Sequence, residues 1–69
     1  MIPFGNHLKK LRKEIGWSQE QLARKLGTKR TNVCAFEAGR SYPRLSTFFK
    51  ICDIFGTDRV MEFQKQSAK

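Results

Sequence analysis

The chain has 69 residues, a formal net charge of +8 and 39% hydrophobic residues, enough for one small core. We therefore expect a single domain over residues 1–69, with its core over 4–63, a flexible polar tail over 64–69 and no room for a ligand-sensing domain. The positive charge favours a polyanionic partner. No segment approaches the length of an apolar membrane span and none resembles a signal peptide, so we expect a cytoplasmic protein without a membrane partner.

The first predicted helix spans residues 4–15. Its apolar residues recur every three or four positions, as they do on the buried face of an amphipathic helix. These residues are Phe4, Leu8, Leu11 and Ile15. Gly16 is expected to end the helix, and His7 is expected to lie on its surface.

A second helix is predicted over residues 19–26. Ser18 followed by Gln21 has the spacing of a capping box, in which each residue bonds the other's backbone at a helix start. Trp17 and Leu22 have the spacing of the accompanying hydrophobic staple. These signals indicate a sharp turn between the first two helices.

A third helix is predicted over residues 29–38, with Thr28 as its N-cap. Gly27 and Gly39 supply the left-handed backbone conformation that ends a helix. The apolar positions expected to lock the second and third helices together are Leu22, Leu26, Val33 and Phe36, with the small Ala23 at their closest approach. Two short crossing helices joined by a tight turn have the layout of a helix-turn-helix, whose second helix reads the DNA major groove.

Residues 40–44 are predicted to form a loop, because Pro43 disfavours a helical conformation for Tyr42. Residues 24–44 carry six basic side chains and one acidic one, so the positive charge is concentrated here. A fourth helix follows and ends at Gly56. Its inward-facing residues are expected to be Leu45, Phe48, Ile51, Cys52 and Phe55.

A short fifth helix is predicted to contain Val60, Met61 and Phe63, with Asp58 as its cap. Phe49, beside the inner face of the fourth helix, joins Met61 and Phe63 as a candidate dimer surface.

These segments together resemble the lambda-repressor-like helix-turn-helix domain of the Cro/Xre family. The motifs that carry the resemblance are Leu11-Arg12, Trp17-Ser18-Gln19, Leu22-Ala23-x-x-Leu26-Gly27, Phe36-Glu37-x-Gly39 and Pro43. The resemblance extends from about residue 4 to residue 58. It implies an all-α fold, a compact domain of five helices in which helices two and three form the helix-turn-helix.

The resemblance also implies roles for particular residues. Those facing base edges or flanking phosphates would be Lys29, Arg30, Thr31, Asn32 and Ala35. Those contacting the phosphate backbone would be Gln19, Arg40, Tyr42 and Arg44. Arg12 and Glu37 match a pair that forms an internal salt bridge in relatives.

Side-chain chemistry refines some of these roles. Arg30 suits guanine and Asn32 suits adenine, although either could be a solvated surface residue. Lys29 fits a phosphate as well as a base. The ring of Tyr42 is expected to pack on the domain, with its hydroxyl still able to reach a phosphate. Cys34 is expected to point outward without a chemical role.

The residues offer no enzymatic or metal-binding chemistry. Two separated cysteines and one histidine fit no zinc spacing, which favours free thiols. No nucleophile–base arrangement, phosphate-binding glycine loop or pair of carboxylates is apparent. We expect no enzyme activity, cofactor, metal or small-molecule ligand.

The sequence therefore predicts a sequence-specific regulator of transcription that binds double-stranded DNA, a repressor or autoregulator acting as a homodimer on a palindromic operator. One alternative keeps the same DNA-binding fold but makes the protein an antitoxin or a restriction–modification controller. Another is a protein-interaction module that no longer reads sequence.

Overall fold

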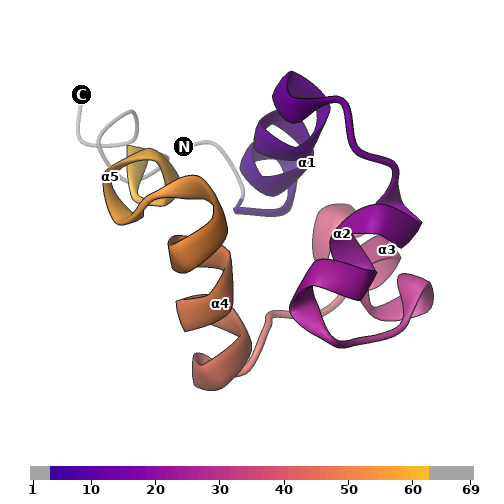
Figure 1. Cartoon of the computed structure of the whole chain (residues 1–69). Coiled ribbons are helices and arrows are strands. Elements are labelled where there is room, and N and C mark those ends of the chain that lie inside the picture. Colours follow the sequence, from indigo (N-terminus) through magenta and orange to yellow (C-terminus); the bar gives the residue numbers. More distant parts are fainter. Residues whose placement is uncertain (1–3, 63–69) are drawn as a thin grey trace.

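A computed structural model describes residues 4–62, and these residues form five α-helices without a strand. The helices are α1 (Phe4–Ile15), α2 (Gln19–Leu26), α3 (Arg30–Ala38), α4 (Leu45–Phe55) and α5 (Thr57–Val60). Helix α3 packs against both α1 and α2, and α4 packs against α5 (Figure 1). The all-α, five-helix architecture predicted from the sequence is confirmed.

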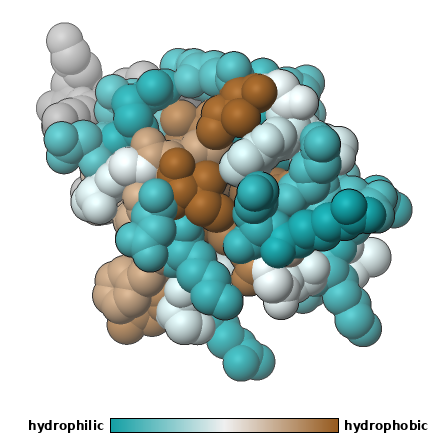
Figure 2. Space-filling model, viewed as in Figure 1, coloured by the Kyte–Doolittle hydropathy of each residue, from teal (hydrophilic) through white to brown (hydrophobic). Residues whose placement is uncertain are grey.

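The core lies where these helices meet. Leu8, Leu22, Val33, Ile51 and Val60 come one from each helix, and each is 0% exposed. Removing apolar side chains from water is the dominant favourable term in folding, so this cluster holds the helices in their relative positions. Hydrophilic residues cover most of the face drawn in Figure 2, with hydrophobic ones reaching the surface between them and beside α4.

Helix α1 approaches α3 very closely at Gly5. A Cβ atom at Gly5 would lie 2.3 Å from the carbonyl oxygen of Phe36 and 2.7 Å from that of Glu37. Only glycine permits this approach, because any side chain would meet backbone atoms that cannot move aside. The first turn of α1 is thereby seated on the C-terminal end of α3.

His7 corrects the prediction that it lies on the surface. It is 2% exposed, and its Nε2 lies 2.7 Å from the backbone oxygen of Arg59. The hydrogen bond compensates for burying the ring, because α5 presents a carbonyl at this point in the interior. A second link joins the same elements, since Arg59 donates to Glu14 across 2.6 Å, and this bond raises the pKa of Arg59 above its usual value.

Two residues predicted to be buried are exposed. Ile15 is 48% exposed, because it is the last residue of α1 and extends past the helices that cover the rest of the apolar face. Leu45 is 68% exposed, because it opens α4 before that helix reaches the core. Phe48, Cys52 and Phe55 are half-buried against the core, as the helical spacing predicted.

The C-terminal part of the domain differs in detail from the prediction. The N-cap of α5 is Gly56 rather than Asp58, because the helix begins at Thr57 and so places Asp58 in its first turn. There the carboxylate still interacts favourably with the positive end of the helix dipole. Met61 follows the helix, whereas Phe63, the last predicted core residue, and the predicted tail 64–69 lie outside the described residues.

Candidate nucleic-acid interface

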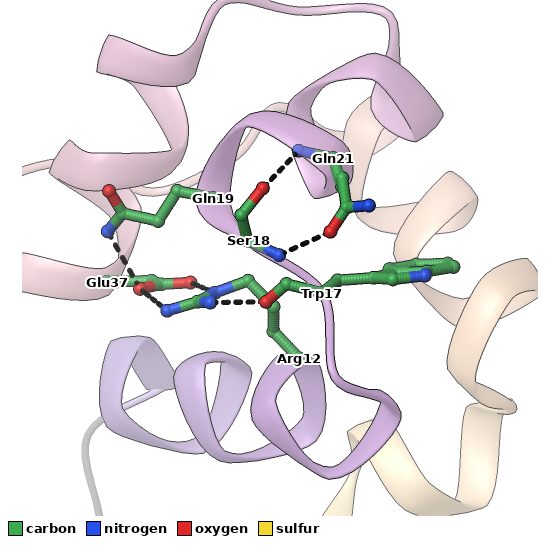
Figure 3. Close-up of polar contacts among 6 residues, drawn as sticks. All are labelled: Arg12, Trp17, Ser18, Gln19, Gln21 and Glu37. Carbon is green, nitrogen blue, oxygen red and sulfur yellow. Dashed lines mark hydrogen bonds and ion pairs between the residues drawn. The ribbon is translucent and has the colours of Figure 1, made fainter.

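The start of α2 is fixed by local hydrogen bonds. The Ser18 hydroxyl accepts from the backbone N–H of Gln21 at 3.1 Å, and the Gln21 side chain accepts from the Ser18 N–H at 2.8 Å (Figure 3). The predicted capping box is therefore present. At the other end, Gly27 adopts φ 71° and ψ 33°, and its N–H bonds to the last turn of the helix. Left-handed backbone of this kind favours glycine, so the sequence itself sets the length of α2.

Helix α3 begins one residue later than predicted. Its N-cap is Lys29 rather than Thr28, and no side chain caps it. The reason is that Thr28 still belongs to the end of α2, since its N–H donates to the carbonyl of Ala23 at 2.9 Å. The turn between α2 and α3 therefore consists of residues 27–29 alone.

The N-terminal end of α3 presents polar side chains to solvent. Lys29, Arg30, Thr31 and Asn32 are all exposed, and Ala35 is half-buried one turn further along. Neither Lys29 nor Arg30 forms an ion pair or side-chain hydrogen bond with any described residue. Val33, one turn further along the helix, is fully buried and anchors α3 to the core. The helix therefore combines unpaired positive charge at its exposed N-terminal end with a buried residue in its next turn.

A buried ion pair ties the same helix to α1. Arg12 Nε donates to Glu37 Oε2 at 2.7 Å, and Nη2 donates to Oε1 at 3.1 Å (Figure 3). A third guanidinium nitrogen donates to the backbone oxygen of Trp17 at 2.6 Å. The two side chains are 8% and 3% exposed, so the charges are removed from water but paired with each other, and Arg12 has a further hydrogen bond to Trp17.

Gln19 joins this network, a contact that the sequence analysis missed. Its Nε2 donates to Glu37 Oε1 at 3.0 Å, so one carboxylate connects α1, α2 and α3 (Figure 3). The side-chain oxygen and the second N–H of Gln19 have no partner among the described residues. A signal was present in the sequence, because the predicted Arg12–Glu37 pair places a carboxylate near the start of α2.

The loop between α3 and α4 is basic and open. Arg40 and Arg44 are exposed, and Arg44 is the N-cap of α4 without a side-chain capping bond. Tyr42 is 75% exposed, so the prediction that its ring packs on the domain is wrong. Pro43 disfavours a helical conformation for Tyr42, which lies in the loop with its side chain accessible from solvent.

A polar groove separates the helix-turn-helix from the start of α4. The described residues that line it include Thr28, Asn32, Tyr42, Arg44 and Lys50, and none of the described lining residues is acidic. Lys50 was missed by the sequence analysis. Its Nζ lies 3.4 Å from the carbonyl oxygen of Leu26, at the end of α2. The i, i+4 spacing of Ser46 and Lys50 on α4 could have indicated that both face this side.

The remaining predicted residues lie elsewhere. Phe49 is 58% exposed on α4 and Met61 is half-buried after α5, whereas Phe63 is outside the described residues. Cys34 is half-buried rather than fully outward, because it lies beside the buried face of α3, and both it and Cys52 are free thiols. Over residues 4–62, no group of three or more potential ligands is placed to hold a metal ion. Among the helices of residues 4–62, none has both the length and the apolar character that a membrane-spanning helix needs.

Comparison with known proteins agrees with this geometry. A profile described as helix-turn-helix matches residues 8–60, a range that runs from within α1, through the turn between α2 and α3, to the last residue of α5. The chain belongs to the Cro/C1-type helix-turn-helix family. This family consists of DNA-binding regulators rather than enzymes, in agreement with the absence of a catalytic arrangement in the sequence. No solved structure matches the chain.

Three curated relatives of this helix-turn-helix chain illustrate the family. The antitoxin HipB of Escherichia coli (strain K12) is 41% identical over 48 residues, which is 70% of this chain and 54% of HipB. The uncharacterized HTH-type regulators YgzD of Bacillus subtilis and MJ0272 of Methanocaldococcus jannaschii are 42% and 43% identical, covering 72% and 74% of this chain and 76% and 77% of their own lengths. The chain therefore spans about half of HipB and three quarters of the other two.

Proposed function

We propose that the protein is a sequence-specific regulator of transcription that binds double-stranded DNA, with α3 in the major groove. The observation that carries the proposal is that Lys29 and Arg30 are exposed and form no ion pair with a described residue, while Val33 of the same helix is buried in the core. Arg30 there is suited to guanine, and arginine–guanine is the commonest specific contact in the major groove. The other base-facing candidates are Lys29, Thr31, Asn32 and Ala35.

Phosphate contacts on both sides of α3 would hold it in register. Gln19 lies at the start of α2, where backbone N–H groups also point outward. Arg40, Tyr42 and Arg44 lie in the open loop beyond α3. Contacts to phosphates fix the orientation of a protein on the duplex, and base contacts supply the specificity.

The protein acts in this proposal as a cytoplasmic homodimer, a repressor or autoregulator on a palindromic operator. Two α3 helices would enter successive major grooves about 34–36 Å apart. Support for a second copy comes from α4, where Leu45 and Phe49 lie one turn apart and are 68% and 58% exposed. Sedimentation of the free protein and of its complex with DNA tests this, and a monomer in both would contradict the homodimer.

Selection of binding sites from random duplexes tests the function itself. We expect enrichment of one motif with two inverted half-sites. Substitution of Arg30 and Asn32 together by alanine should abolish the enrichment while the protein remains folded by circular dichroism. Enrichment of no motif by the wild-type protein would instead support a protein-interaction module that no longer reads sequence.

The similarity to HipB favours a second candidate, an antitoxin with the same DNA-binding fold. A restriction–modification controller would share that fold as well. Co-expression with the product of each neighbouring gene separates these functions from a free-standing regulator. Relief of growth arrest caused by one such product would identify an antitoxin, and protection of host DNA from a neighbouring nuclease would identify a controller.

A further inference from the structure

Thr28 and Asn32 are joined across the turn that precedes α3. The side-chain Nδ2 of Asn32 donates a hydrogen bond to Thr28 Oγ1 at 2.6 Å. Thr28 is half-buried and Asn32 is exposed, and both line the polar groove beside α4. The hydrogen bond therefore restrains a side chain at the solvent-facing end of α3.

This bond changes what Asn32 can offer to a base pair. A free carboxamide has two N–H donors and one carbonyl acceptor. With one N–H directed to Thr28, one donor and the acceptor remain. In the major groove, adenine presents one acceptor, N7, and one donor, the N6 amino group, whereas guanine presents two acceptors, N7 and O6.

We propose that Thr28 is a positioning residue that makes Asn32 select adenine over guanine. A carboxamide with two free N–H groups can donate to the two acceptors of guanine. When one N–H donates to Thr28, the remaining N–H and the carbonyl oxygen match only the acceptor and donor of adenine. The proposal deepens the proposed function and rests on it, because it requires the start of α3 to lie in the major groove.

The structure also indicates how to remove this bond without disturbing the fold. The backbone N–H of Thr28 closes the end of α2 by donating to Ala23, and that bond does not involve the hydroxyl. An apolar side chain after a left-handed glycine commonly packs against the preceding helix. Thr28→Val should therefore fold normally while losing the acceptor, and Thr28→Ser keeps it.

The test compares wild type, T28V, T28S and N32A on the motif obtained by binding-site selection. The base pair read by Asn32 is the one whose preference N32A removes. At that pair, wild type and T28S should favour adenine over guanine by about tenfold, within the range of one bidentate contact. T28V should lower the ratio to about twofold or less. Preferences at the other pairs and affinity for non-specific duplex should not change.

Three outcomes would overturn the proposal. If T28V keeps the full adenine preference, or if N32A changes the preference at no pair, the inference is wrong while the proposed function stands. If the wild-type protein enriches no motif, the proposed function fails and the inference falls with it. A thermal melt of each variant shows that any change comes from recognition rather than unfolding.

Discussion

Arg30 occupies the first position of α3, with its guanidinium in solvent and no acidic partner among the described residues. Because this guanidinium forms no contact that the fold needs, its charge and its N–H donors are available to bind a ligand. The same holds for Lys29. What separates them is geometry, because a planar guanidinium matches the two acceptors of guanine and an ammonium does not.

Replacing Arg30 by alanine should weaken binding to the selected operator by about 1–3 kcal/mol and relax the preference at one base pair. Titrations by fluorescence anisotropy against the operator and its single-pair variants measure both effects. The matched control is Lys10→Ala, which removes an exposed cation from α1. Equal losses for the two variants would show that Arg30 contributes only general positive charge.

Removing one partner of the buried Arg12–Glu37 ion pair should lower the stability of the protein. Glu37→Gln would leave Arg12 buried and charged opposite a neutral amide, and breaking such a pair typically costs about 3–5 kcal/mol. Chemical denaturation should therefore show a large loss of stability. Glu20→Gln is the control, because its partner Arg24 is 77% exposed and surface pairs contribute about 1 kcal/mol or less. Similar denaturation midpoints for Glu37→Gln and Glu20→Gln would contradict a special role of the buried ion pair in stability.

Between elements, the decisive contact is that of α1 with the end of α3. Gly5→Ala should destabilise the protein strongly, because the added methyl group would lie 2.3 Å from a backbone oxygen. The neighbouring Asn6 is exposed on the same helix, so Asn6→Ala should be neutral or slightly stabilising, as alanine is the better helix former. Thermal unfolding of the two variants gives the comparison. An unchanged melting temperature for Gly5→Ala would mean that α1 and α3 can move apart at this point without a loss of stability.

The elements also show what could be predicted from the sequence. Helix α2 was predicted with correct ends, because Ser18, Gln21 and Gly27 set both termini through local bonds. The start of α3 was not, because threonine is a favoured N-cap residue, whereas the N–H of Thr28 bonds back to Ala23 in α2 and Lys29 takes the N-cap position. His7 was misplaced for a different reason: its partner is a backbone oxygen 52 positions away, which no local pattern reveals. The exposed candidate residues followed from position in the motif, whereas Lys50 and the Gln19–Glu37 bond depend on tertiary packing.

At the scale of the whole molecule, the net charge of +8 should make DNA binding steeply dependent on salt. Removing a side chain that binds one phosphate lowers the slope of log K against log salt by about 0.9. Arg44→Gln should therefore reduce the slope by about one unit while leaving the selected motif unchanged. Affinities measured between 50 and 300 mM salt, roughly the range in which counterion release dominates, provide the slope. An altered motif with an unchanged slope would assign Arg44 to a base instead of a phosphate.

The carboxylate of Glu37 accepts hydrogen bonds from Gln19 of α2, which faces the proposed duplex, and from Arg12 of α1, which does not. A phosphate oxygen that engaged Gln19 would restrain the amide already bonded to Glu37, and through it the guanidinium of Arg12. Occupancy of the operator should consequently slow amide hydrogen exchange in α1, beyond the footprint of the DNA. The buried Arg12–Glu37 pair would then transmit the effect of DNA binding from α2 to α1, a helix that does not itself contact the duplex.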